Sequence, residues 1–121
     1  DAIAELLAEI ASSPQEASST LAYISAHPEA YQQLLDYGDH TLRYCFAQFL
    51  DGGQTGLEGA IMWGLICELA PEAEQVPLTG SGQEFFDAWL TSARADMAER
   101  GAGWMESHAP AALLLLQTAG G

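Results

Sequence analysis

The residues best suited to binding a metal ion are gathered in a ten-residue stretch that ends at Cys45. Asp36 and Asp39 offer carboxylate oxygens, while His40 and Cys45 offer the nitrogen and sulfur ligands that zinc prefers. These side chains could surround one ion only if the chain bends sharply at Gly38. Asp39, however, stands where the start of a helix is expected, and Cys45 falls on an apolar helical stripe. We therefore interpret the group as structural and predict no metal site.

Catalytic and cofactor-binding motifs are incomplete or absent. Gly80-Ser81-Gly82 lacks the G-x-S-x-G spacing of a nucleophile elbow, and Ser81 fits the start of a helix better. Asp51-Gly52-Gly53 begins like a calcium loop, but Met62 occupies the twelfth position, where a bidentate acid is required. The sequence has no H-E-x-x-H, E-x-x-H, C-x-x-C or Walker pattern. We expect a protein that acts by binding, with no catalytic residue and no cofactor.

The charge of the chain is strongly one-sided. Its 121 residues include seventeen Asp and Glu, three Arg and no Lys, which gives a formal net charge of −14. Acids make up an ordinary share of the chain, because roughly a quarter of an average domain is charged and half of that is acidic. The imbalance therefore comes from missing bases, as a coding bias without selection on function would also produce. Such a surface repels nucleic acid and anionic membranes and attracts basic partners, increasingly so at low salt.

Apolar residues recur at helical spacing along nearly the whole chain, and no alternating strand pattern appears. Capping boxes, in which Ser or Thr is followed three residues later by Glu, mark helix starts at Ser13, Thr55 and Ser81. Glycine or proline marks most of the helix ends. The expected helices occupy about residues 3–12, 14–26, 28–37, 39–51, 57–69, 82–100 and 110–116.

The helix expected over residues 57–69 carries only two charged residues, Glu58 and Glu68, and is apolar on nearly all sides. A helix of this kind is buried by its neighbours. We therefore predict an all-α fold, a compact bundle of six to seven short helices around this central one. A chain of 121 residues is long enough for one domain of ordinary size, so residues 1–121 are expected to form a single domain.

Carboxylates are densest where this central helix ends, at Glu68, Glu72 and Glu74. We expect Glu68 to emerge into water there, although burial with a raised pKa is the alternative. The leading hypothesis is a small acidic inhibitor, of the immunity or antitoxin type, that docks a basic protein partner through these acids. The expected partner-binding residues are Glu68, Glu72, Glu74, Asp51, Tyr37 and Trp104, the two aromatic residues supplying anchoring contacts.

A second hypothesis is an apolar pocket for a small molecule. Gly56, Ala60 and Gly64 form a small-residue stripe on the central helix, which we expect to pack closely against Phe46 and Phe49. The same stripe would alternatively admit a flat apolar ligand. The residues expected to line this pocket are Trp63, Gly64, Phe86, Trp89 and Met97.

One segment of the sequence has a loose resemblance to a known protein family. The stretch from His27-Pro28-Glu29 to Thr55-Gly56, followed by a small-residue-rich helix that ends at Glu68-Leu69-Ala70, loosely resembles the effector-binding half of TetR-type repressors. The resemblance implies an apolar ligand pocket and a helical homodimer interface, for which the run Leu113 to Leu116 is the candidate. A third hypothesis, mimicry of nucleic acid, requires carboxylates ordered along one face, and their scattered positions do not favour it.

Cysteine content and hydropathy bear on the compartment. Cys45 and Cys67 are too few for a disulfide framework, and the hairpin expected between their helices would offset them by roughly 7 Å along the axis. We predict two reduced thiols and, from these, a cytoplasmic protein. The longest apolar run, Ala109 to Leu116, is less than half the length of a membrane span, so no membrane association is expected.

Overall fold

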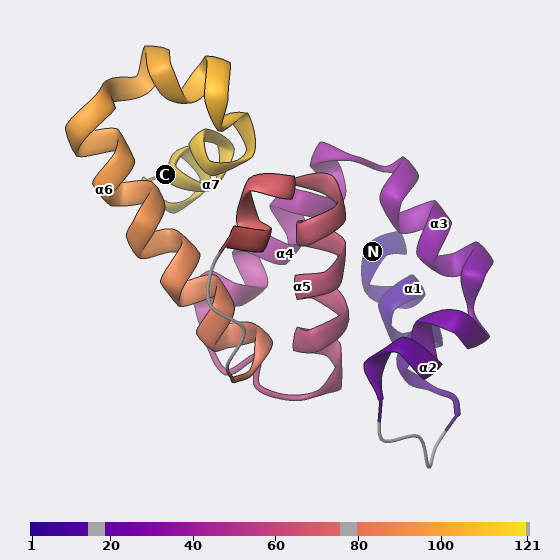
Figure 1. Cartoon of the computed structure of the whole chain (residues 1–121). Coiled ribbons are helices and arrows are strands. Elements are labelled where there is room, and N and C mark those ends of the chain that lie inside the picture. The colour runs from indigo at the N-terminus through magenta and orange to yellow at the C-terminus, as the bar shows by residue number, and fades with distance from the viewer. Residues whose placement is uncertain (15–18, 76–79, 121) are drawn as a thin grey trace.

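The computed structural model describes residues 1–14, 19–75 and 80–120, and it is helical in nearly all of them (Figure 1). The described residues form seven α-helices and one 3-10 helix and contain no strand, which confirms the predicted all-α bundle. The helices are α1 (Ala2–Ala11), α2 (Thr20–Ala26), α3 (Pro28–Asp36), α4 (Asp39–Asp51), α5 (Leu57–Leu69), α6 (Gly82–His108) and α7 (Pro110–Gly120), and the 3-10 helix η1 (Pro71–Gln75) follows α5 directly.

Helix α5 is the centre of the bundle, with the bounds that its apolar sequence predicts. It contacts α1, α2, α3, α4 and α6. Because it is surrounded, its apolar residues are buried on more than one side, including Ile61, Leu65 and Ile66. Burial of each such side chain contributes about 1.5–3 kcal/mol before the opposing conformational entropy is counted. Figure 1 shows α1, α2 and α3 on one side of α5 and α6 with α7 on the other.

Several helix boundaries lie where capping and glycine signals predict them. Ser81 caps α6 in a complete capping box, in which the Glu84 amide donates to Ser81 Oγ at 3.3 Å and the Ser81 amide donates to Glu84 Oε1 at 3.0 Å. Helix α3 begins at Pro28, as expected of proline in a first turn. Gly38 and Gly52 bound α4 with φ of 57° and 92°, values that side chains with a Cβ rarely adopt.

One predicted capping box and one predicted helix start are wrong. Helix α5 has Gly56 as its N-cap with no side-chain cap, so Thr55 does not form the expected box. The second helix begins at Thr20, capped by the Ser19 hydroxyl at 3.2 Å from the Leu21 amide, and not at Pro14. The rest of the box expected at Ser13, including Glu16, lies outside the described residues.

Helix α6 continues past its expected end. The chain breaks helical geometry at Gly101, with φ 85° and ψ 167°, and then resumes as helix up to His108. Only glycine adopts this backbone conformation readily, which is why the break falls there. The break divides α6 into a first arm, residues 82–100, and a second arm, residues 102–108, and Figure 1 shows the second arm turning back toward α7.

Close backbone contact at the central helix is made by Gly59 and Gly82, and not by the expected stripe of Gly56, Ala60 and Gly64. A Cβ added at Gly82 would collide with the carbonyl oxygen of Gly59, at the point where α6 starts beside α5. A Cβ at Gly64 would meet only the Tyr31 hydroxyl, at 3.4 Å, and a Cβ at Gly56 would meet nothing within 4 Å. The expected close packing of the Gly56, Ala60 and Gly64 stripe is therefore a wrong prediction, and Gly59 carries that role.

Candidate functional site

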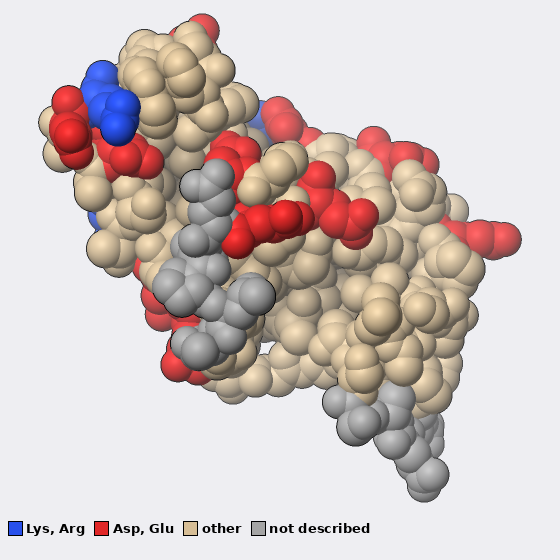
Figure 2. Space-filling model, in the orientation of Figure 1, with Lys and Arg blue, Asp and Glu red and all other residues tan. Residues whose placement is uncertain are grey.

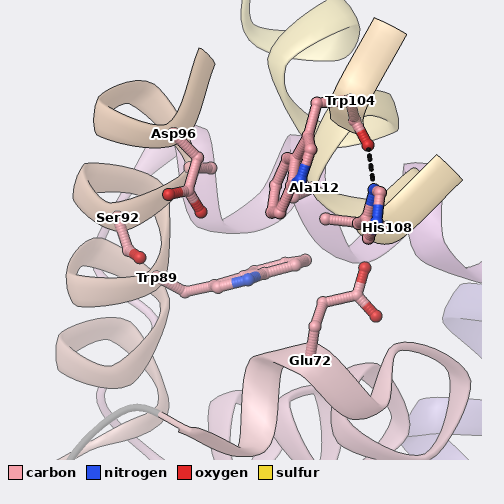
Figure 3. Close-up of a pocket in the computed structure, with 9 residues that line it drawn as sticks. Glu72, Trp89, Ser92, Asp96, Trp104, His108 and Ala112 are labelled. Atoms are coloured by element: carbon pink, nitrogen blue, oxygen red, sulfur yellow. Dashed lines mark hydrogen bonds between the residues drawn. The ribbon is translucent and has the colours of Figure 1, made fainter. Parts of the chain in front are cut away.

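A cavity of about 340 Å³ opens between η1, the two arms of α6 and the start of α7 (Figure 3). Glu72 enters it from η1, and Ala109 and Ala112 close it at the start of α7. The remaining lining residues lie on α6. They are Trp89, Ser92, Ala93 and Asp96 on the first arm and Trp104 and His108 on the second.

Helical spacing and the break at Gly101 together create this cavity. Trp89, Ser92, Ala93 and Asp96 stand at i, i+3, i+4 and i+7, so they share one face of the first arm. Trp104 and His108 are likewise four residues apart on the second arm. Because the chain turns at Gly101 and the second arm runs toward α7, residues of both arms line the same cavity (Figure 1). Alanines at the base leave the space between them unfilled.

Trp89 provides a rigid aromatic surface inside the cavity. Its side chain is only 4% exposed and packs against Phe46, with ring centroids 5.7 Å apart, and edge-on against Trp63 at 6.0 Å. Contacts of this kind hold an aromatic ring in one orientation. Figure 3 shows the Trp89 ring lying across the cavity, with Asp96 near one end and Glu72 near the other.

The Trp104 ring contacts two residues of its own helix, Arg100 and His108, which lie four residues before and after it. The His108 ring stacks on it at 4.7 Å with an interplanar angle of 7°, and the Arg100 guanidinium carbon lies 4.5 Å from its ring centroid. Arg100 Nε also lies 3.9 Å from Asp96 Oδ1. His108 Nδ1 donates to the Trp104 carbonyl oxygen at 3.0 Å, since that oxygen can only accept. One ladder of i, i+4 contacts thus runs from Asp96 to His108.

Glu72 has an unusual environment for a carboxylate. Its Oε2 atom is buried and has no hydrogen-bond partner within the described structure. A buried charged oxygen without a partner is costly, because it loses its hydration and gains nothing in return. Figure 3 shows the carboxylate directed into the space beneath His108 and beside the Trp89 ring. The cavity therefore presents an acceptor that needs a donor.

Three of the other expected partner-binding residues lie at the same end of the bundle. The three are Glu68, exposed at the end of α5, Glu74, exposed on η1, and Tyr37 in the turn before α4. Burial, with smaller contributions from the Glu74 and Glu68 carboxylates, raises the pKa of the Cys67 thiol to about 11. Tyr37 is 46% exposed in the turn between α3 and α4. Because α4 returns antiparallel to α5, this turn is close to the end of α5 (Figure 1).

Glu68 also affects a buried tyrosine. Burial is the main cause that raises the pKa of Tyr31 well above its usual value, and the Glu68 carboxylate beside its hydroxyl adds to the effect. Glu68 itself is exposed, as expected of its position at the helix end. Asp51 is separated from the other acids, because it lies at the opposite end of α5, roughly 18 Å away at 1.5 Å per residue.

The five residues expected to line an apolar pocket do not surround one cavity. Trp63 and Trp89 are in contact, but Phe86 is fully buried and stacks on Phe49 with centroids 4.8 Å apart. Gly64 faces Tyr31 on α3. Met97 is partly buried against the core. Of these five residues, only Trp89 lines the cavity described above.

The sequence reasoning missed Asp96 and His108 as site residues. The available signal was the spacing of Asp96, Arg100, Trp104 and His108, each four residues after the last. That spacing was hidden because Gly101 was interpreted as the end of the helix. In the sequence, a glycine that interrupts a helix looks the same as a glycine that ends one.

The surface around the cavity is acidic. On the face drawn in Figure 2, acidic side chains form a band over the end of α5 and η1, whereas basic ones appear mainly toward the outer end of α6. Within the described residues, Asp96 is the one carboxylate within ion-pair distance of an arginine. The remaining described acids are not neutralised by a base of that kind.

Residues 1–14, 19–75 and 80–120 contain neither a metal-binding cluster nor a membrane-spanning helix. No group of three or more His, Cys, Asp or Glu side chains in these ranges is placed to hold a metal ion. No helix in the same ranges combines the length and apolar character that spanning a bilayer requires. Cys45 and Cys67 are both free thiols, as predicted, with Cys45 buried and Cys67 partly buried.

Comparison with known proteins found no match among protein-family models, curated proteins or solved structures. The cavity and the acidic surface around it are therefore the basis for a functional proposal.

Proposed function

We propose that this chain is a small non-enzymatic binding protein that docks a basic protein partner, in the manner of an inhibitor, immunity protein or antitoxin. The observation that carries the proposal is the cavity beside η1, where aromatic residues and uncompensated carboxylates occur together. Protein interfaces draw most of their binding energy from such aromatic anchors, and complementary charge speeds association.

The charge distribution supports the same choice of partner. The chain has a formal net charge of −14, and the described acids have almost no internal bases to neutralise them. A basic surface that approaches η1 would meet Glu68, Glu72 and Glu74 together. Tyr37 and the partly exposed Trp104 lie toward this end of the bundle and would supply apolar contact area.

Capture from a lysate of the source cells, with washes of increasing salt, tests this function. The chain should retain one or a few basic proteins at low salt and release them at high salt, because charge attraction is screened. The variant that replaces Glu68, Glu72 and Glu74 by Gln should lose most of this capture. A control that neutralises Glu5, Glu29 and Glu58, exposed acids away from η1, removes the same charge and should retain the capture.

Two results would contradict the proposal. One is that no basic protein is retained at either salt concentration. The other is that both triple variants lose capture equally, since that would reduce the effect to total charge. Circular dichroism of both variants establishes that they remain folded.

A small-molecule receptor is the second candidate. The volume of the cavity, about 340 Å³, lies near the lower end of the range found for small-molecule sites. Native mass spectrometry of the purified protein distinguishes the two, since a retained ligand would add a defined mass.

We further propose a cytoplasmic location, which the free thiols Cys45 and Cys67 support.

A further inference from the structure

We infer that the cavity beside η1 receives the guanidinium group of an arginine side chain supplied by the basic partner, an inference that rests on the proposed function. The group would lie on the face of Trp89, between the Glu72 and Asp96 carboxylates. Three features of the cavity lead to this assignment: its aromatic surface, its unpartnered acceptor and its access from solvent.

The aromatic surface favours a cation. The face of a tryptophan ring attracts a cation placed within about 6 Å of its centroid, and the attraction is greater where water is excluded. Trp89 lines the cavity and is 4% exposed, and Phe46 and Trp63 fix its orientation. Both carboxylates lining the cavity carry the opposite charge to such a guest.

The unpartnered acceptor distinguishes between kinds of cation. Glu72 Oε2 is buried and lacks a donor, so a guest must bring an N–H group to satisfy it. A quaternary ammonium has no N–H and would leave this oxygen unpaired. A lysine ammonium has donors but is a compact, strongly hydrated charge. A guanidinium is planar, less strongly hydrated and carries several donors in one plane, so it can stack on Trp89 and donate to a carboxylate at its edge.

The protein already holds one guanidinium by the same chemistry. Arg100 lies over the Trp104 ring at 4.5 Å while its Nε faces Asp96 at 3.9 Å. Trp89 and Glu72 repeat this combination of ring and carboxylate without an internal arginine. Because Asp96 is already engaged by Arg100, Glu72 is the carboxylate on which recognition depends most.

The cavity is also accessible and large enough. It opens to solvent at Ser92 and His108, which line it and are exposed, whereas the Trp89 ring and Glu72 Oε2 are its buried part. Its volume of about 340 Å³ falls within the range of small-ligand sites. An arginine side chain can therefore enter from a docked partner with its aliphatic stem toward the opening.

Calorimetric titration with three blocked tripeptides tests the inference. The peptides are Gly-Arg-Gly, its lysine counterpart, and its counterpart with citrulline, which keeps the shape of arginine but has no charge. The arginine peptide should bind at least tenfold more tightly than the lysine peptide, and the citrulline peptide should show no binding. Tetramethylammonium, a cation without donors, should also fail to bind. Equal affinity for the arginine and citrulline peptides would overturn the inference.

Variants locate the binding site. Glu72→Gln should weaken binding of the arginine peptide at least tenfold. Glu58→Gln, at an exposed acid at the start of α5 and away from the cavity, is the control and should change binding less than twofold. Trp89→Phe keeps an apolar ring and should weaken binding several-fold with the fold retained. If Glu72→Gln has no larger effect than Glu58→Gln, the cavity is not the site.

The two proposals fail in distinguishable ways. If lysates yield a basic partner whose capture survives Glu72→Gln and Trp89→Phe, and the arginine peptide does not bind, the guanidinium site is wrong while the docking function stands. If the arginine peptide binds the cavity but no basic protein is captured, the partner is wrong and the cavity is a receptor for free guanidinium compounds.

Discussion

At the scale of single residues, Glu72 is the side chain whose position is hardest to explain by stability alone. A carboxylate oxygen that is buried without a donor costs about 1–3 kcal/mol relative to one that is satisfied. Residues that serve binding often carry such a cost, because the stabilising partner arrives with the ligand. The exposed Glu74, on the same short helix, carries no such cost.

Replacement of Glu72 by Met should therefore stabilise the free protein. Methionine keeps the length of the side chain and removes the unpaired charge, so the free energy of unfolding should rise by about 1 kcal/mol in urea titrations. Glu74→Met should change it by less than about 0.5 kcal/mol. A loss of stability in Glu72→Met greater than 1 kcal/mol would mean that the carboxylate has a structural role, contrary to this account.

At the scale of helices, the break at Gly101 determines whether the site exists. It brings Trp104 and His108 back over Trp89 and Asp96. Nothing lies within 4 Å of a Cβ added at Gly101, so the barrier to substitution there is conformational and not steric. Gly103, two residues later, has equally open space and ordinary helical geometry, so it is a matched control.

Gly101→Ala should lower the free energy of unfolding by about 1–3 kcal/mol, because its backbone conformation is nearly restricted to glycine. Gly103→Ala should leave it unchanged or raise it by up to about 1 kcal/mol through helix propensity. Urea denaturation measures both. If Gly101→Ala is as well tolerated as Gly103→Ala, the kink is not a fixed feature of the chain.

Much of the helical order could be predicted from sequence, and the exceptions have local physical causes. The central helix follows from its apolar residues, and α6 begins where its capping box predicts. Thr55 failed as a cap because the chain enters α5 through Gly56. The cavity could not be predicted, because the sequence does not distinguish a glycine that turns a helix, as Gly101 does, from one that ends it.

At the scale of the whole molecule, two cysteine thiols and a tyrosine hydroxyl that are buried or partly buried should make the fold less stable at alkaline pH. Burial raises the pKa of Cys45 to about 12, and burial together with the Glu74 and Glu68 carboxylates raises that of Cys67 to about 11. Burial and then Glu68 raise the pKa of Tyr31. Each group keeps its proton in the folded state at a pH where the unfolded chain has already released it. Their stabilising effect is therefore complete below the unfolded pKa values and is lost as pH rises.

The free energy of unfolding should accordingly fall between about pH 9 and pH 11, by about 1–3 kcal/mol from Cys45 alone. Cys45→Ala should be less stable at pH 7, because it loses packing in the core, but should show a shallower fall over this interval. Denaturant titrations at pH 7, 9 and 11 measure both slopes. Identical slopes in the two proteins would mean that the Cys45 thiol titrates normally in the folded state.

The central claim is that a cationic, donor-bearing side chain enters the cavity lined by Trp89, Trp104 and Glu72. The most direct test is the ¹H–¹⁵N NMR spectrum of the labelled protein during titration with the arginine peptide and with its citrulline counterpart. The account predicts that the indole N–H signals of Trp89 and Trp104 shift with arginine and not with citrulline, and that Glu72→Gln removes the shift. Absence of any shift at these two tryptophans with arginine, or equal shifts with both peptides, would contradict it.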